Sequence, residues 1–321
     1  MWKRLWAFVM TCIFAGLPFA SRAVEGFKGV ESQAVVIWSQ GTRLQGRIWR
    51  PEEAAPGGEA RPAILLAHGW GGLLEHLDVT YGPKFATAGF VVLGFDYRGW
   101  GESEGILIPV EEIPEPDVKG EMQVRVREIR EVVDPWSQLE DLRAALAFLA
   151  SEPDVDPGRI GIWGTSYGGG HAMTLAASEP VAAAVVQVGS QGGDSPKELV
   201  AHARRRASQK ARGELESRIP QGIDKAPGLS GTPDWARMVS YRPIDLADRV
   251  RIPVLFIDMS DEELFDSRKH GRAAYERVRK NAPARYELLK GSHYDVYGKH
   301  YGRASDLAVE WFQEHLKGDG S

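Results

Sequence analysis

The stretch Arg159-Ile-Gly-Ile-Trp-Gly-Thr-Ser-Tyr-Gly-Gly-Gly-His171 decides the fold of this chain. An apolar, β-rich run ends at Trp163, the pentapeptide Gly164-Thr-Ser-Tyr-Gly168 follows, and small residues typical of a helix continue to Ala177. A serine in the pattern G-x-S-x-G between a strand and a helix lies on a sharp, strained turn, and its glycines leave room for neighbouring backbone. The pattern therefore predicts that Ser166 projects from a sheet edge at a helix N-terminus, where a developing anion is favoured. No lysine follows the glycines, as a phosphate-binding P-loop would require.

Short apolar runs on both sides of this motif indicate a mostly parallel sheet. They show no polar alternation, which suits strands that are covered on both faces. The runs are Ala63–Ala67, Phe90–Phe95, Ile160–Trp163, Val181–Val188, Pro253–Ile257 and Tyr286–Leu289. Two further β-rich runs, Ala34–Trp38 and Arg43–Trp49, predict an antiparallel hairpin at the edge of the sheet.

Helical patterns alternate with these runs. Ser137-Gln-Leu-Glu140 has the form of a capping box, so a helix is predicted to begin at Ser137 and to end before Pro153. A second helix is predicted from about Ser305 to Leu316. Alternating strands and helices predict a doubly wound α/β fold.

Residues 102–133 and 190–247 do not fit this alternation. The first segment is rich in Pro, Glu and Val, and the second is polar with basic residues along one predicted helix. We interpret both as cap-like insertions over the carboxyl edge of the sheet, where such folds bind ligands. Residues 24–321 are then one domain, and Arg204–Arg206 is interpreted as a solvated helix face.

Composition narrows the class of protein. The 321 residues are 43% apolar and 26% charged, which disfavours disorder, collagen and coiled coil. The formal charge of −5 provides no basic footprint for nucleic acid. We expect a small-molecule or short peptide substrate as the partner, and the sequence carries no signal for an oligomeric state.

The N-terminus has the layout of a secretory signal peptide, residues 1–23. Lys3 and Arg4 precede an uncharged stretch, and the small residues Ser21 and Ala23 occupy positions −3 and −1 of the expected cleavage site. We therefore expect a periplasmic or secreted protein that meets a membrane only through this segment.

An uncleaved membrane anchor is the alternative interpretation of this segment. Its apolar part, Leu5–Phe19, is shorter than the roughly 20 residues that span a bilayer, and Pro18 breaks a helix near its end. Cys12 is the only cysteine, so cleavage would leave no disulfide and no thiolate nucleophile. Cleavage would also change the formal charge from −5 to −8.

The serine turn and its surroundings resemble the α/β-hydrolase superfamily over roughly residues 34–317. Val155-Asp-Pro-Gly-Arg-Ile-Gly-Ile-Trp-Gly-Thr-Ser-Tyr-Gly-Gly169 is similar to the dienelactone hydrolase, prolyl-oligopeptidase-like and Xaa-Pro dipeptidyl-peptidase or cocaine-esterase-like groups. His68-Gly-Trp-Gly-Gly72 resembles the H-G-x-x-G turn after the third strand of the superfamily. Asp96-Tyr-Arg-Gly-Trp-Gly-Glu-Ser103 resembles the segment D-x-R-G-x-G-x-S after the fourth strand. The resemblance implies an α/β-hydrolase fold with catalytic residues in the chain order serine, acid, histidine.

The same resemblance implies an oxyanion hole made of the backbone N–H groups of Trp70 and Tyr167. His68 precedes Ser166 in the chain and is therefore expected to brace the turn in which it lies. Asp96 and Arg98 are expected to brace the backbone of the loop after the fourth strand. Trp70, Trp100 and Trp136 could line the cleft or belong to the core, and both interpretations stay open.

A serine hydroxyl needs an imidazole to take its proton and a carboxylate to hold that imidazole. Lys290-Gly-Ser-His-Tyr-Asp295 resembles the histidine loop of the superfamily, which implies His293 as the base, with His300 as the substitute. When the chain is aligned with the superfamily without a gap after Pro253, the acid of the superfamily falls on Glu262. With a one-residue deletion it falls on Asp261. Asp258 and Glu263 are the remaining candidates.

These residues predict two-step acyl transfer that requires no metal and no organic cofactor. The favoured function is a serine hydrolase of carboxylic esters or lactones, because the chain has no room for the extra domains that gate peptides in prolyl peptidases. A serine peptidase of the X-Pro dipeptidyl-peptidase type, an acyltransferase and a non-catalytic binding protein are the alternatives.

Overall fold

The computed structural model describes residues 22–24, 26–53, 55–216, 224–226 and 228–317. The predicted signal peptide lies outside these ranges, apart from Arg22 and Ala23 in strand β1 (Arg22–Val24). No helix within the described ranges is long and apolar enough to cross a membrane.

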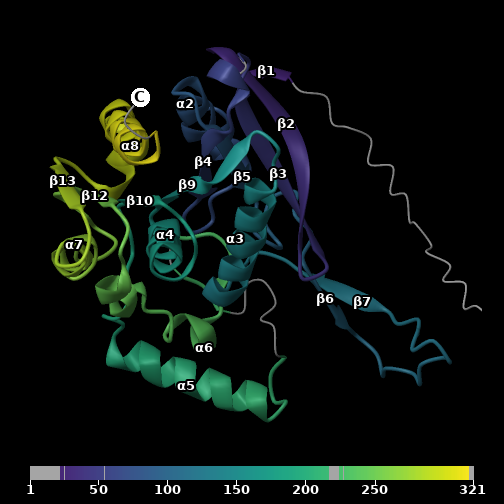
Figure 1. Cartoon of the computed structure of the whole chain (residues 1–321). Coiled ribbons are helices and arrows are strands. Elements are labelled where there is room, and N and C mark those ends of the chain that lie inside the picture. The colour runs from purple at the N-terminus through teal and green to yellow at the C-terminus, as the bar shows by residue number, and fades with distance from the viewer. Residues whose placement is uncertain (1–21, 25, 54, 217–223, 227, 318–321) are drawn as a thin grey trace, which may run out of the picture.

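The described residues form a central sheet of nine strands in the order β1-β2-β3-β5-β4-β9-β10-β12-β13 (Figure 1). Pairing is antiparallel from β1 to β5 and parallel from β5 to β13. Each predicted apolar run overlaps one of these strands, although the run Val181–Val188 extends beyond both ends of its strand. Their bounds are β2 Phe27–Ser39, β3 Thr42–Pro51, β4 Arg61–Ala67, β5 Val91–Phe95, β9 Val155–Thr165, β10 Ala183–Gln187, β12 Val254–Met259 and β13 Ala284–Leu289.

The predicted edge hairpin is present as β2 and β3. Its two-residue turn consists of Gln40 and Gly41, which both have positive φ, at 50° and 82°. Such a turn matches the right-handed twist of the two strands. This edge of the sheet is antiparallel, and the fold is otherwise a mostly parallel, doubly wound α/β sheet.

Helices cover both faces of the sheet and bury a separate apolar cluster on each (Figure 1). One face carries α3 (Pro135–Ala150), α4 (Tyr167–Ser178) and α7 (Gly271–Val278). The other face carries α1 (Leu74–Asp78), α2 (Tyr81–Thr87) and α8 (Tyr301–Leu316). Single turns of 3-10 helix lie at η1 (Pro56–Gly58) and η3 (His293–Tyr297), and a longer one lies at η2 (Pro243–Arg249).

The predicted start of α3 was wrong. The helix begins at Pro135, and its N-cap is Asp134, which accepts a hydrogen bond from the backbone N–H of Trp136. Proline suits the first helical position because its missing N–H would have no partner there. Ser137 lies inside the first turn and donates to Asp134 Oδ2 over 2.6 Å.

The first insertion differs from the expectation of a cap. Its strands β6 (Ile106–Pro109) and β7 (Val126–Ile129) pair as an antiparallel hairpin that projects away from the body of the protein (Figure 1). Its short strand β8 (Val132–Val133) pairs with β11 (Thr232–Pro233) of the second insertion. The two insertions therefore meet at this small ladder.

The second insertion carries α5 (Lys197–Ala211) and α6 (Trp235–Met238). Arg204 and Arg205 on α5 are exposed, as the solvated-face interpretation expects. Arg206 differs, because its guanidinium forms an ion pair with Asp224 over 2.5 Å and is largely buried.

Candidate active site

Ser166 occupies a strained turn between β9 and α4. Its φ of 53° and ψ of −120° lie outside the regions that ordinary residues favour. A Cβ on Gly164 would lie 2.2 Å from the Gly168 carbonyl oxygen, and a Cβ on Gly168 would lie 2.2 Å from that of Ala67. The two glycines of the motif are therefore required by direct backbone packing.

The structure brings Ser166, His293 and Glu262 together. His293 Nε2 lies 3.1 Å from Ser166 Oγ, and His293 Nδ1 lies 2.7 Å from Glu262 Oε2. The side chains of His293 and Glu262 are only 1% and 3% exposed. Because a carboxylate accepts at Nδ1, the ring proton is on that nitrogen and Nε2 is free to accept the serine proton.

The other carboxylates of this loop have different surroundings. Glu263 accepts from the backbone N–H of His293 over 2.8 Å, and Asp261 is exposed. Asp258 is buried and accepts from the Tyr286 hydroxyl over 3.0 Å, and burial raises its pKa to about 7. Of the four candidate acids, Glu262 is the one that contacts the imidazole of His293.

The other candidate histidines lie away from the serine. The Nε2 of His300 contacts the Lys290 carbonyl oxygen at 2.8 Å. His68 is buried beside the turn that follows β4, with Nδ1 3.1 Å from the Gly69 carbonyl oxygen. Burial lowers the pKa of His68 to about 4, so it is a neutral residue that packs against Tyr97.

The turn after β4 lies directly against Ser166. A Cβ on Gly69 would lie 2.9 Å from Ser166 Cβ. Within the described part of the chain, the backbone N–H groups of Trp70 and Tyr167 donate to no acceptor. Two unpaired amides beside a serine hydroxyl can hold the negative charge of a tetrahedral intermediate.

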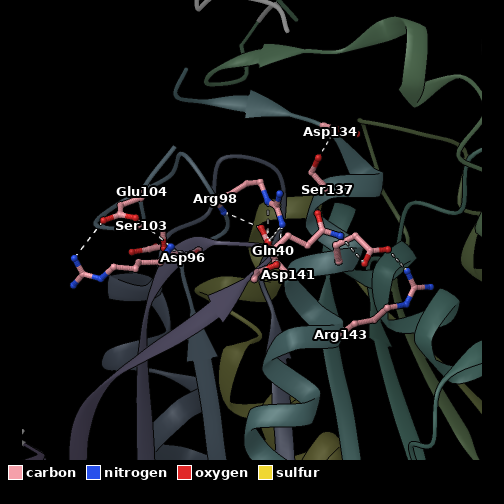
Figure 2. A network of polar contacts seen from close by, with 12 residues as sticks. Gln40, Asp96, Arg98, Ser103, Glu104, Asp134, Ser137, Asp141 and Arg143 are labelled. Carbon is pink, nitrogen blue, oxygen red and sulfur yellow. Dashed lines mark hydrogen bonds and ion pairs between the residues drawn. The ribbon is translucent and has the colours of Figure 1, made fainter. Parts of the chain in front are cut away.

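A polar network that includes Asp96, Arg98 and Asp141 surrounds the segment after β5 (Figure 2). Asp96 accepts from the backbone N–H groups of Leu74 and Glu102, at 2.8 and 3.2 Å. Arg98 donates to Asp141 over 2.5 Å and to Ser39 over 2.8 Å. These contacts tie the segment after β5 to α1, α3 and the edge hairpin, so Asp96 and Arg98 hold backbone in place.

A hydrogen-bonded chain beside Ser166 could not be predicted from the sequence. Tyr297 Oη lies 2.7 Å from Thr165 Oγ1, which accepts from Gln187 Nε2 over 3.2 Å. Tyr81 in turn donates to Gln187 Oε1 over 2.9 Å. Burial raises the pKa of both tyrosines, so both hydroxyls stay protonated. The signal in the sequence is weak: Tyr297 follows His293 by one helical turn.

Ser166 and His293 line a cavity of about 820 Å³. Its walls are largely apolar and include Trp70, Leu77, Val79, Trp163, Met238 and Phe265. Trp70 thus faces the cleft, whereas Trp100 is buried and the indole N–H of Trp136 donates to the Arg237 carbonyl oxygen. Only one of the three tryptophans considered from the sequence therefore lines this cavity.

The fold and the site define an α/β hydrolase, and comparison with known proteins identifies its family. The family model "X-Pro dipeptidyl-peptidase (S15 family)" matches residues 40–202, about half of the chain. The chain therefore belongs to the S15 family within the α/β-hydrolase superfamily, and it is a hydrolase. A second family model, "BAAT / Acyl-CoA thioester hydrolase C terminal", matches residues 138–295.

Several individual proteins are similar to this chain. An uncharacterized 31.7 kDa protein in the traX-finO intergenic region of Escherichia coli is 26% identical over 87% of this chain and 97% of its own length. The quorum-quenching protein AidA of Acinetobacter baumannii is 37% identical over 46% of this chain and 40% of its own length. The α/β hydrolase GrgF from Penicillium superposes with a TM-score of 0.66 at 16% identity, covering 89% of this chain and 99% of that one. At this identity the likeness shows the fold alone.

Proposed function

We propose that this hydrolase cleaves carboxylic esters or lactones through an acyl-enzyme on Ser166. The observation that carries the proposal is the continuous contact from Glu262 through His293 to Ser166 at the wall of an apolar cavity. This arrangement has the nucleophile, the base and the group that orients the base within hydrogen-bond reach of one another.

The reaction would proceed in two halves. Ser166 Oγ attacks the carbonyl carbon of the ester while its proton moves to His293 Nε2. The carbonyl oxygen becomes an anion that the amides of Trp70 and Tyr167 hold, and Glu262 stabilises the imidazolium. The bond to the alcohol oxygen then breaks, and His293 protonates that oxygen. Water then attacks the carbonyl carbon of the acyl-enzyme while its proton moves to His293 Nε2. The bond to Ser166 Oγ breaks and His293 returns the proton to it, which releases the acid and restores the serine.

The character of the cavity favours an ester over a peptide. An X-Pro peptidase must hold the charged N-terminus of its substrate, and a buried carboxylate in the cleft would serve that purpose. Among the described residues, Glu75 is the one carboxylate that lines this cavity, and its side chain is 74% exposed. Asp194, which lines an adjoining cavity, is 34% exposed, so neither carboxylate is buried. The apolar walls instead suit the hydrocarbon portion of an ester.

A substrate screen tests this function. The purified protein is assayed against p-nitrophenyl esters of graded chain length, lactones, acyl thioesters and X-Pro anilides. We expect the highest kcat/KM on esters or lactones; fastest turnover of the anilides would instead establish a peptidase. Ser166→Ala should lower turnover by roughly 10⁴-fold or more and abolish fluorophosphonate labelling. Undiminished labelling would place the nucleophile elsewhere.

We also propose that residues 1–23 act as a cleaved signal peptide and that the enzyme works in the periplasm or outside the cell. The charged start, apolar middle and small residues before position 24 support this assignment. Expression of the full chain in a bacterial host, followed by N-terminal sequencing of the exported protein, should give a chain that begins at Val24. A cytoplasmic chain with an intact N-terminus would contradict it.

A further inference from the structure

A second cavity of about 370 Å³ adjoins the one that contains the reactive serine. It lies between the start of α4, the second insertion and the loop that precedes α7. The residues that line both cavities are Tyr167, Ser190, Met238, Leu264 and Phe265. A ligand in the first cavity can therefore extend into the second.

Two residues that line the second cavity carry buried hydrogen-bonding atoms that the reaction above does not use. His270 is 2% exposed, and its Nδ1 accepts from the backbone N–H of Gln191 over 2.8 Å. The proton of the neutral ring is therefore on Nε2, and this N–H forms no hydrogen bond with the described residues. The buried hydroxyl of Tyr167 also has no partner there.

A carboxylate stands next to these donors. Asp194 Oδ2 lies 3.1 Å from His270 Nε2, but their geometry does not form a hydrogen bond. The Asp194 side chain is 34% exposed, so it can accept from a ligand without first being uncovered.

An aromatic side chain places this group beside the reaction centre. The ring of Phe265 lies 4.6 Å from that of His270 and 5.8 Å from that of His293, measured between centroids. A substrate whose scissile carbonyl contacts Ser166 can therefore present a second functional group to His270.

The chemistry of the cavity selects among ligands. A carboxylate would be repelled by Asp194, an ammonium would not satisfy the N–H and O–H donors, and a hydrocarbon would leave all three groups unpaired. A secondary amide supplies a carbonyl oxygen that can accept from these donors and an N–H that can donate to Asp194.

We propose that the second cavity is a substrate subsite in which His270, Tyr167 and Asp194 recognise an amide group of the ester. This inference rests on the proposed ester hydrolysis and names the class of ester: one that carries an amide within a few bonds of the scissile carbonyl. The cavity then determines specificity, and the triad carries out the bond cleavage.

Two series of matched substrates test the subsite. The first compares p-nitrophenyl N-butyrylglycinate with p-nitrophenyl 4-oxoheptanoate, which lacks the N–H, and with p-nitrophenyl heptanoate, which lacks both groups. The second compares the butyrate ester of N-(2-hydroxyethyl)propanamide with hexyl butyrate, so that the amide lies in the alcohol. The readout is the ratio of kcat/KM between members of a series on the same preparation, which does not depend on the fraction of folded enzyme.

We expect the amide substrate to be preferred in one series, and Asp194→Ala and His270→Gln to lower that preference by about fivefold each. Glu198→Ala, at an exposed position of α5 outside the cavity, is the matched control and should keep the wild-type ratio. Ratios that are the same in the wild type and both variants, in both series, would overturn the subsite. If no ester in either series is hydrolysed, the proposed function itself fails, which is a different result.

Discussion

Glu262 and His293 contact each other through both carboxylate oxygens, with Oε2 and Oε1 at 2.7 and 3.0 Å from Nδ1. The two residues come from loops that follow different strands, β12 and β13, which are neighbours in the sheet. The parallel pairing of these strands therefore places Glu262 beside His293. The backbone N–H of Leu264 donates to Glu262 Oε1 over 3.0 Å and helps to fix the carboxylate.

Glu262→Gln should lower kcat/KM for p-nitrophenyl butyrate by about 10²–10⁴-fold, because a neutral amide holds the imidazole tautomer poorly and does not stabilise the imidazolium. Asp261→Asn is the matched control. It changes the adjacent, exposed carboxylate and should leave the rate nearly normal. A slow Asp261→Asn enzyme beside a normal Glu262→Gln enzyme would reverse the assignment.

The sequence was informative where chemistry depends on local backbone. A Cβ on either glycine of the Gly-x-Ser-x-Gly turn would lie 2.2 Å from a backbone oxygen, and one on Gly69 after β4 would lie 2.9 Å from Ser166 Cβ. These constraints act on residues that are consecutive in the sequence, so a local motif reveals them. The position of His293 could be predicted because its loop follows the last strand, which ends at Leu289. Glu262 could be selected only by counting from Pro253, since nearby carboxylates have the same chemical character.

Features that depend on contacts between distant segments could not be predicted. The Tyr297 hydroxyl reaches Thr165, which is 132 positions earlier, and His270 meets the Gln191 backbone from 79 positions away. The sequence around these residues does not indicate such contacts. The start of α3 was misplaced because Asp134 and Ser137 are both residue types that suit an N-cap. Pro135 favours the first helical position, so Asp134 becomes the N-cap.

Gly69→Ala should lower kcat by about 10²–10³-fold, the effect of losing one donor of an oxyanion hole. The new methyl carbon would lie 2.9 Å from Ser166 Cβ and 3.2 Å from the Thr165 carbonyl oxygen, so the turn that carries Trp70 must move. Gly302→Ala in α8 is the control, because its Cβ would meet nothing within 4 Å. It should keep full activity and stabilise the protein by about 0.5–1 kcal/mol. A fully active Gly69→Ala enzyme would contradict this oxyanion hole.

Asp141→Asn should lower the free energy of unfolding by about 3–5 kcal/mol, because it leaves the guanidinium of Arg98 largely buried without its counter-charge. The two side chains are 0% and 9% exposed. Urea denaturation measures the change. Asp245→Asn breaks an ion pair with Arg242 whose side chains are 51% and 46% exposed, and it should change stability by less than about 1 kcal/mol. Equal losses of stability in the two variants would show that burial does not determine how much the Arg98–Asp141 ion pair contributes to the free energy of unfolding.

Asp258 should make the stability of the protein depend on pH. Burial raises the pKa of this carboxyl from 3.8 to about 7, so the folded state holds its proton over a range in which the unfolded state has released it. Its contribution to stability is therefore fully present below about pH 4 and is lost as pH rises through about 7.

Asp258→Asn replaces the carboxyl with a group that stays neutral at every pH. The Tm of this variant minus that of the wild type should therefore increase between pH 5 and pH 8, as the wild type alone acquires a buried charge. Tyr286→Phe gives an independent check, because its hydroxyl donates to Asp258 and lowers the pKa of that carboxyl. Its removal should move the fall in stability of the Tyr286→Phe protein to higher pH. Parallel Tm curves for the wild type and Asp258→Asn would mean that Asp258 is ionised in the folded protein throughout, and that other groups set its pH dependence.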